Sequence, residues 1–452
     1  MSEGSMGAPT RHTIKWRDAD FVDETKLFTE LERVFDLCHG CRRCFNLCDS
    51  FPRLFDLIDN SPSEEIDGVA KADYWKVVDA CTLCDLCFMT KCPYVPPHEW
   101  DLDFPHLMLR ARAYQFKHGK GHKKQEQLGE MDKNGPLGVK LSGLANWATE
   151  RSNTMTRTVM QVTHGVHKDA ALPTFAKQTC RTQAKAQVLE INTTAPAHGV
   201  RKAVIYASCF GEYNDPAIVL DTRAVLAKNG IDAEIVYPEC CGMPQLEQGD
   251  LARVAGKARA IALSLKPYVT EGYDIVVPVA SCALMLKFEW PLIEPDDENV
   301  KALSQATFDV TEYVVDLAAK QGLADGLKPL KGGVTAHIAC HARAQNMGRK
   351  AQELLKLIPE MDITVIERCS GHGGSWGVTK EFFEVGMKIG APVFRDAAKV
   401  DNAYVVSECP LARDQILQGL ERKDKTIEGP GKALRHPVQL LARAYGLTTE
   451  ES

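Results

Sequence analysis

The sequence predicts an α+β multidomain protein, in which a helical, cysteine-rich N-terminal domain precedes a tandem duplication of α/β lobes. Two runs of four cysteines, both before residue 93, mark the first part. After about residue 200, short β-branched runs alternate with amphipathic stretches, which is typical of a parallel sheet covered by helices. Cysteines at the ends of these runs recur at a nearly constant interval, which indicates an internal duplication.

A chain of 452 residues with 44% hydrophobic residues can bury several cores. We place the helical domain at residues 1–115, a connector at 116–200, and the two α/β lobes at 201–325 and 326–452. No apolar run approaches the ~18 residues that a membrane-spanning helix needs, so only a peripheral membrane contact is left open. The net charge of -6 argues against nucleic acid as the main ligand.

The chain contains sixteen cysteines, and its amino terminus lacks the apolar core of an export signal. We therefore expect a cytoplasmic protein, with a place on the inner face of the membrane left open. In a reducing compartment, so many cysteines point to metal ligation rather than to disulfides.

The two N-terminal runs have the spacing of iron-sulfur ligands. They read Cys38-x2-Cys41-x2-Cys44-x3-Cys48 and Cys81-x2-Cys84-x2-Cys87-x4-Cys92, with Pro93 next. Zinc is less favoured, because zinc ribbons and fingers usually pair two C-x2-C knuckles across a spacer. In two-cluster ferredoxins the last cysteine of each run ligates the other cluster. That exchange predicts two [4Fe-4S] clusters, one held by Cys38, Cys41, Cys44 and Cys92 and the other by Cys81, Cys84, Cys87 and Cys48.

The interval between the runs, residues 49–80, is too long for a compact bacterial ferredoxin and resembles the helical ferredoxin-like modules of respiratory iron-sulfur subunits. In "KLFTELERVFDLC" the apolar residues follow helical spacing. This stripe predicts a core-facing helix with Cys38 at its end.

The predicted strands of the two lobes end in cysteines that fall into corresponding positions. Cys209 corresponds to Cys340, Cys241 to Cys369, and Cys282 to Cys409, at offsets of 131, 128 and 127 residues. Because ligands of open α/β sheets lie beyond the carboxyl ends of the strands, we expect the cysteines of each lobe to converge on one edge.

The segments "PECCGMPQ", "SCALMLKFEWP", "IACHARAQNMG", "ERCSGHGGSWG" and "SECPLA" resemble the paired CCG cysteine-rich domains of heterodisulfide reductase B subunits. With the ferredoxin-like module in front, the chain is similar to the C subunits of anaerobic glycerol-3-phosphate dehydrogenases and related iron-sulfur oxidoreductases. The resemblance implies a subunit that docks a soluble flavoprotein at the membrane and passes electrons to a quinone.

Neither lobe keeps the five cysteines of the full CCG pattern. The first lobe retains Cys209, Cys240, Cys241 and Cys282, which suffice for an ordinary [4Fe-4S] cluster. The second retains Cys340, Cys369 and Cys409, with Arg368 in place of the first cysteine of the pair. Two alternatives stay open for this lobe: a metal site that leaves one iron open or takes His341 or His372 as fourth ligand, or a lobe that has lost its metal.

The connector contains the basic stretch "KHGKGHKKQ", followed by Leu137, Leu141, Leu144 and Ala148 on one helical face with Trp147 beside them. This combination could touch an anionic membrane. The expectation is instead a solvated linker and a helix packed on the N-terminal domain.

The leading hypothesis is an iron-sulfur electron-transfer subunit between a flavoprotein dehydrogenase and a quinone, thiol-disulfide or protein acceptor. No flavin or nicotinamide fingerprint is visible, so the two-electron chemistry would come from the partner. The alternative is a catalytic, disulfide-reductase-like subunit with a metal in the lobes, for which His341 and His372 are the candidate catalytic residues. A metal-stabilised scaffold is the non-enzymatic alternative.

Overall fold

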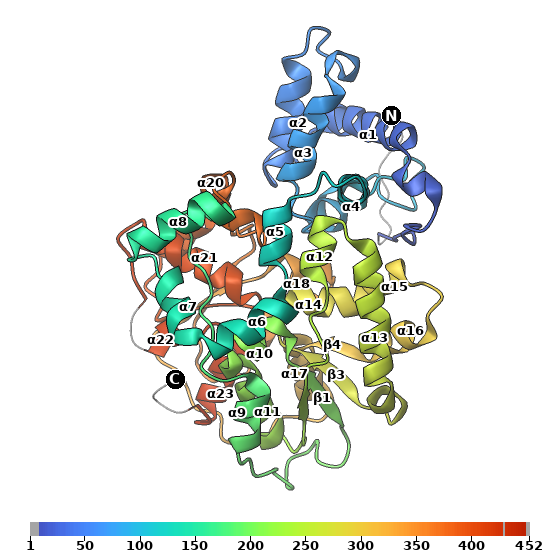
Figure 1. Cartoon of the computed structure of the whole chain (residues 1–452). Coiled ribbons are helices and arrows are strands. Elements are labelled where there is room, and N and C mark those ends of the chain that lie inside the picture. Colours follow the sequence, from blue (N-terminus) through green and yellow to red (C-terminus); the bar gives the residue numbers. More distant parts are fainter. Residues whose placement is uncertain (1–8, 428–429, 449–452) are drawn as a thin grey trace.

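The computed structural model describes residues 9–427 and 430–448. Figure 1 shows the N-terminal helices projecting from a larger body that contains two α/β lobes, with the connector helices along one side of that body. The N-terminal part consists of α1 (Glu24–Cys41), α2 (Ser50–Asp59), α3 (Tyr74–Ala80) and α4 (Phe104–Lys117). It also contains the short 3-10 helices η1 (Ala19–Val22), η2 (Ile66–Gly68) and η3 (Lys71–Asp73) and the π-helix η4 (Cys87–Lys91).

Helix α1 confirms the predicted apolar stripe. The Asp23 side chain accepts a hydrogen bond from the Lys26 amide and caps the helix, which ends at Arg42 in the left-handed conformation. The buried side chains are those at helical spacing, namely Leu27, Phe28, Leu31, Val34 and Phe35. Cys38 and Cys41 therefore lie in the last turn of a helix that is held by its own core.

Each lobe contains a small, fully parallel sheet, as the sequence predicts. The first sheet has the order β2-β1-β3-β4, with β1 (Ala203–Tyr206), β2 (Glu234–Val236), β3 (Asp274–Val277) and β4 (Thr307–Asp309). The second has the order β6-β5-β7, with β5 (Val334–His337), β6 (Ile363–Ile366) and β7 (Tyr404–Ser407). The central strands β1 and β5 are buried along their whole length, which is expected of a parallel sheet with both faces covered.

Helices follow the strands in both lobes. In the first lobe they are α10 (Ser208–Tyr213), α11 (Pro216–Lys228), α12 (Met243–Gln248), α13 (Leu251–Thr270), α14 (Ala280–Leu284), η5 (Met285–Glu289), α15 (Trp290–Ile293), α16 (Glu298–Ala306) and α17 (Val310–Lys320). In the second they are α18 (Cys340–Ala344), α19 (Lys350–Leu355), η6 (Trp376–Val378), α20 (Phe383–Ala398), α21 (Pro410–Glu421), α22 (Pro430–Ala433) and α23 (Pro437–Ala444). Helix α23 packs against α11, so the C-terminal helix ties the second lobe to the first.

The connector folds into α5 (Lys123–Leu128), α6 (Met131–Lys140), α7 (Ser142–Thr149), α8 (Thr154–His164) and α9 (Cys180–Ala186). The expected packing of residues 137–148 on the N-terminal domain is wrong. The helix breaks at Leu141, α6 packs against α10 of the first lobe, and the side chains of Leu137, Leu144 and Trp147 are exposed. Spacing shows which residues share a face, but the partner of α6 is decided by contacts such as the ion pair between Asp132 and Lys257.

His436, at the start of α23, gives the fold a predicted dependence on pH. Its Nδ1 accepts a hydrogen bond from the Val438 amide at 3.2 Å, and burial lowers its pKa to about 3. The unfolded chain, with a histidine pKa of about 6.5, takes up a proton first, so stability is lost as the pH falls below about 6.5.

Between pH 7 and pH 5 this one imidazole is expected to cost about 2 kcal/mol of unfolding free energy. Asparagine at position 436 keeps an acceptor for the helix cap and cannot titrate. Denaturant unfolding at both pH values should therefore show a loss smaller by this amount in the His436→Asn variant. Equal losses in the two proteins would contradict the assignment.

Candidate iron-sulfur sites

The structure brings together the four cysteines Cys38, Cys41, Cys44 and Cys92. Two come from the last turn of α1, one from the following loop and one from the end of η4. Burial, with added repulsion from Cys92, Cys44 and Cys41, raises the pKa of Cys38 well above its usual value. Burial, with repulsion from Cys92 and Cys41, raises the pKa of Cys44 to about 12. Such mutually raised pKa values are typical of thiols that face one another and share a cation when ligated.

The second group contains Cys48, Cys81, Cys84 and Cys87. Burial raises the pKa of Cys48, and interactions with Cys81 and Cys84 raise it further. The pKa of Cys87 is raised by burial, then by Cys84 and Cys81, and also by Cys44 of the first group. The two groups therefore lie next to each other.

The loop that carries Cys84 has an unusual backbone. Leu83 and Asp85, on either side of it, have φ values of 48° and 62° in the left-handed region, where non-glycine residues are uncommon. This conformation lets the Leu83 amide donate to the Cys81 Sγ at 3.5 Å. Amide-sulfur hydrogen bonds of this kind tune the potential of iron-sulfur clusters.

The first lobe collects its four thiols at the carboxyl edge of its sheet, where the sequence predicts them. The Sγ atoms of Cys209 and Cys240 lie 3.7 Å apart, and those of Cys241 and Cys282 lie 3.2 Å apart. Hydrogen bonding with Cys209 and Cys241 lowers the pKa of Cys240, so the negative charge of the group is favoured on this sulfur.

Residues that sequence reasoning missed surround Cys240. Asp132 of α6 accepts hydrogen bonds from the Cys240 amide at 2.9 Å and from the Tyr237 hydroxyl at 2.6 Å. The buried Lys257 donates to Asp132 and to Glu239, both at 2.6 Å. No local sequence pattern predicts this arrangement, because Asp132 reaches the thiols only through the packing of the connector on the first lobe.

The second lobe brings Cys340 and Cys369 together, whereas Cys409 packs against the small cluster of Ala280, Ala339 and Ala342. Hydrogen bonding with Cys340 lowers the pKa of Cys369 to about 7, and the Gly371 amide donates to its sulfur at 3.3 Å. After Cys369, the nearby Cys84 thiol is the next cause that raises the pKa of Cys340. Cys340 of the second lobe thus lies beside Cys84 of the second N-terminal group.

The two candidate histidines follow the two cysteines, His341 directly after Cys340 and His372 three residues after Cys369. Burial lowers the pKa of His341, and the nearby Asp85 and the backbone of Leu83 oppose that shift. Burial lowers the pKa of His372 to about 4, and its Nε2 has no hydrogen-bond partner among the described residues. Their roles as ligands or proton donors stay predictions.

The N-terminal groups fit iron-sulfur clusters by their donor chemistry, since each offers four buried or half-buried thiols and one loop supplies an amide-sulfur hydrogen bond. Across residues 9–427 and 430–448, no three His, Cys, Asp or Glu side chains are grouped closely enough to hold a single metal ion. A cubane spreads its thiolates over separate iron atoms, so its ligands need not gather around one point.

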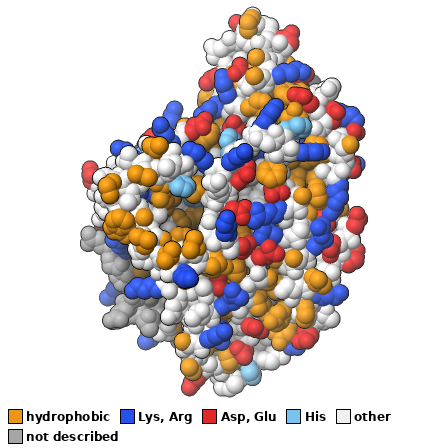
Figure 2. Space-filling model, viewed as in Figure 1, with side chains coloured by type: hydrophobic (Ala, Val, Ile, Leu, Met, Phe, Trp, Pro, Cys, Tyr) orange, Lys and Arg blue, Asp and Glu red, His pale blue; other side chains and the backbone are white. Residues whose placement is uncertain are grey.

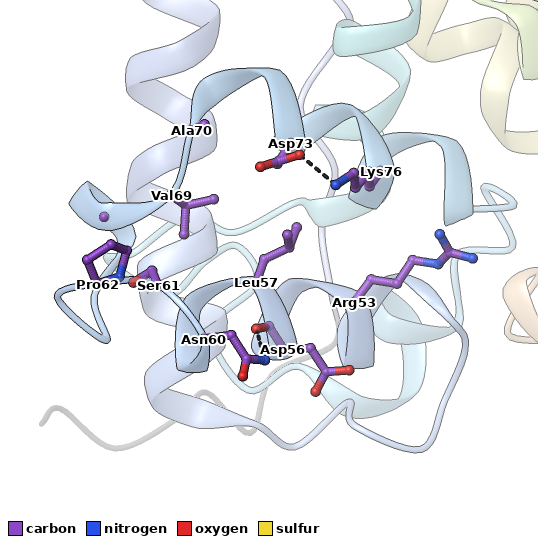
Figure 3. Close-up of a pocket in the computed structure, with 11 residues that line it drawn as sticks. Arg53, Asp56, Leu57, Asn60, Ser61, Pro62, Val69, Ala70, Asp73 and Lys76 are labelled. Atoms are coloured by element: carbon purple, nitrogen blue, oxygen red, sulfur yellow. Dashed lines mark hydrogen bonds and ion pairs between the residues drawn. The ribbon is translucent and has the colours of Figure 1, made fainter.

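A pocket of about 520 Å³ lies between α2 and α3, far along the chain from the lobe thiols (Figure 3). Its lining includes Arg53 and Lys76, which pair with Asp49 and Asp73, and it contains no cysteine or histidine. The pocket is therefore separate from the thiol groups. In the described part of the chain, no helix combines the length and the apolar character needed to cross a bilayer.

Comparison with known proteins identifies the lobes. The cysteine-rich domain called CCG matches residues 203–287 and 334–412. The C chain of the anaerobic glycerol-3-phosphate dehydrogenase from Escherichia coli K12 is 26% identical over 247 residues, which are 54% of this chain and 59% of that protein. Lactate utilization protein A of Bacillus pumilus is 28% identical over 188 residues, 39% of this chain and 75% of that protein.

An uncharacterized iron-sulfur protein of Methanocaldococcus jannaschii is 26% identical over 229 residues, 49% of this chain and 42% of that protein. The chain thus spans little more than half the length of the glycerol-3-phosphate dehydrogenase protein. None of these three similar proteins is a heterodisulfide reductase B subunit. The chain contains two copies of the CCG cysteine-rich domain and is homologous to the C chain of an anaerobic glycerol-3-phosphate dehydrogenase and to lactate utilization protein A.

Proposed function

We propose that the chain is an iron-sulfur electron-transfer subunit that accepts electrons from a flavoprotein dehydrogenase and delivers them through its second lobe to a quinone, thiol-disulfide or protein acceptor. The single observation that carries the proposal is the docking of the second lobe on the segment around Cys81 and Cys84. There the Trp376 indole donates to the Asp79 carbonyl at 2.9 Å, and the Cys84 thiol lies close enough to Cys340 to raise its pKa. This docking joins the N-terminal thiol groups to the second lobe, and hence two parts of the chain that are about 250 residues apart in sequence.

In this proposal Cys38, Cys41, Cys44 and Cys92 hold one [4Fe-4S] cluster, and Cys81, Cys84, Cys87 and Cys48 hold the other. Bound there, the clusters would supply one-electron redox chemistry. The chain contributes the burial that excludes water from the thiols and the Leu83 amide that donates to Cys81. Both influence the redox potential, because solvent exposure and hydrogen bonds to sulfur are two of the factors that set it.

Of the two N-terminal thiol groups, the second is the better placed to pass electrons to the second lobe. Cys84 contacts Cys340, and the Trp376 indole donates to the Asp79 carbonyl at 2.9 Å, so the loop after β6 is fastened to the segment just before Cys81. Repulsion from Cys44 on Cys87 connects the first group to the second. The contacts between these thiols therefore run in the order first group, second group, second lobe.

The test begins with anaerobic purification and measurement of iron, zinc and acid-labile sulfide. Two [4Fe-4S] clusters require about 8 iron per chain, and each further cluster adds about 4. The dithionite-reduced protein is then mixed with a water-soluble quinone while the visible absorption is followed. Re-oxidation of the clusters supports this electron-transfer route, here called the relay. Zinc in place of iron would overturn it.

The same preparation separates the relay from direct catalysis in the lobes. A relay should turn over a dehydrogenase substrate only when the flavoprotein partner is added. A change of the visible spectrum when a disulfide is added to the isolated, oxidised chain would instead favour a catalytic site in the lobes.

A further inference from the structure

The connector exposes an apolar surface that nothing in the described structure covers. Twelve large hydrophobic side chains are exposed among the described residues, and seven of them lie between residues 137 and 162. These seven, here called the connector face, are Leu137, Leu141, Leu144, Trp147, Met155, Val159 and Val162, with exposed fractions from 46% to 73%. Figure 2 shows hydrophobic side chains gathered over the part of the molecule where Figure 1 places α7 and α8. Patches of this kind mark interaction sites.

Six residues of the connector face fall into two groups with regular spacing along the chain. Leu137, Leu141 and Leu144 recur at intervals of four and three residues, and so do Met155, Val159 and Val162. Such intervals place side chains on one side of a helix. Met155, Val159 and Val162 therefore form a stripe on α8, whereas Leu137, Leu141 and Leu144 run across the break between α6 and α7.

The opposite sides of these helices are fixed to the body. Arg157, with 1% of its surface exposed, donates to the carbonyls of Lys168, His167 and Ala170 at 2.9, 2.8 and 2.6 Å. Asn146 of α7 exchanges two hydrogen bonds with the backbone of Phe175. Since α7 and α8 are anchored from behind, the exposed side chains cannot turn inward without breaking buried hydrogen bonds.

The surroundings of the connector face are basic. Residues 133–168 contain a single acidic residue, Glu150, against five lysines and arginines, of which Arg157 is buried and Arg151 pairs with Glu421, so that Lys133, Lys140 and Lys168 remain. The preceding segment 117–124 contains four lysines, two histidines and no acidic residue. Its Lys124 ammonium donates to the Val162 carbonyl at 3.4 Å, so this basic segment lies against the end of α8.

We propose that the connector face binds an anionic lipid bilayer surface. A bilayer surface offers apolar depth and negative charge in one plane, which matches exposed Leu, Val, Met and Trp side chains flanked by lysines. Trp147 is of the residue type that is enriched at the level of the lipid headgroups. The argument rests on the surface alone and holds whether or not the proposed relay is correct.

The position of the face adds a functional consequence that does rest on the proposed relay. Directly after α8, Val166 pairs with Thr379, and the His167 amide donates to the Val378 carbonyl at 2.8 Å. The face is thus attached to the loop of the second lobe that carries Cys369 and His372. A membrane-soluble acceptor would meet the chain at the second lobe, where the proposed relay passes its electrons on.

The test is flotation of the purified, cluster-loaded full chain with vesicles of phosphatidylcholine alone or with phosphatidylglycerol added. The chain is expected to float with the anionic vesicles at low salt and to be released at high salt, because lysine attraction is screened. The Leu144→Glu/Val162→Glu variant should bind at least about tenfold more weakly, since each side chain loses its apolar burial.

Leu263 and Val188 are exposed hydrophobic residues outside the connector face and provide the matched control. The Leu263→Glu/Val188→Glu variant adds the same charge and should bind as the unchanged chain does. Lys123→Glu/Lys124→Glu should reduce binding to anionic vesicles only. Iron content, measured for every variant, shows that the chain has folded around its clusters.

Three results would overturn the proposal. The unchanged chain could fail to float with anionic vesicles, or both double glutamate variants could bind equally well. The third is a dimer in sedimentation that the connector-face variant alone dissociates, which would make a second copy of the chain the occupant. Electron transfer plays no part in these readouts, so their failure is distinct from failure of the relay.

Discussion

Replacing Cys84 with alanine is expected to remove about 4 of the roughly 8 iron atoms per chain and to slow re-oxidation by a quinone more than about a hundredfold. The reason is twofold, since Cys84 is a proposed ligand and also the thiol that contacts Cys340. Iron and sulfide analysis and electron paramagnetic resonance of the reduced protein measure the loss of the cluster, and stopped-flow absorption measures the rate of re-oxidation.

Two further variants separate these roles. Cys180→Ala removes a buried thiol that belongs to neither cysteine pattern, so iron content and transfer rate should both be unchanged. Cys340→Ala leaves the eight N-terminal cysteines intact, so about 8 iron should remain while transfer slows. If Cys340→Ala transfers electrons at the normal rate, the second lobe is not on the route.

Replacing Gly371 with alanine should destabilise the second lobe by about 3–5 kcal/mol. Gly371 has a φ of +77°, and an added Cβ would stand 1.8 Å from the carbonyl oxygen of Gly386 in α20. Strain and overlap therefore act together at the residue whose amide donates to Cys369. Denaturant unfolding followed by circular dichroism gives the change in unfolding free energy.

Gly322 provides the matched control, because its φ of +88° imposes the same kind of strain while an added Cβ would meet nothing within 4 Å. Gly322→Ala should cost about 1 kcal/mol. Similar losses in the two variants would mean that the loop at 370–377 moves away from α20 at little expense, and the close approach would not be needed for the lobe.

Much of the fold follows from local chemistry. The helical stripe before Cys38 is buried residue by residue, and the β-branched runs form parallel strands, because periodicity and strand composition report directly on which side chains must leave water. The duplication is visible because cysteines occupy corresponding strand ends in both lobes. The assignment of the eight N-terminal cysteines to two clusters comes from spacing and stays a prediction, as do the domain boundaries.

The surroundings of the thiols are harder to predict from the sequence. Spacing indicates that Cys84 is a ligand, but its contact with Cys340 joins residues that only the docking of the N-terminal domain on the second lobe brings together. Asp132 and Lys257 are ordinary charged residues in the sequence, and they acquire a role at Cys240 because α6 packs on the first lobe. The connector is expected from its spacing to pack on the N-terminal domain, and packing turns its apolar face outward instead.

Local sequence patterns specify which residues carry the chemistry: cysteines at cluster spacing, a helical core to hold the first run, and two α/β lobes with thiols at their strand ends. These features follow from short-range spacing, which acts within a few turns or strands. Which thiols meet across domains, and which apolar side chains stay exposed, is set by tertiary packing. Those outcomes depend on contacts between segments far apart in the chain, and the free energy of such contacts is set by how complete surfaces fit together.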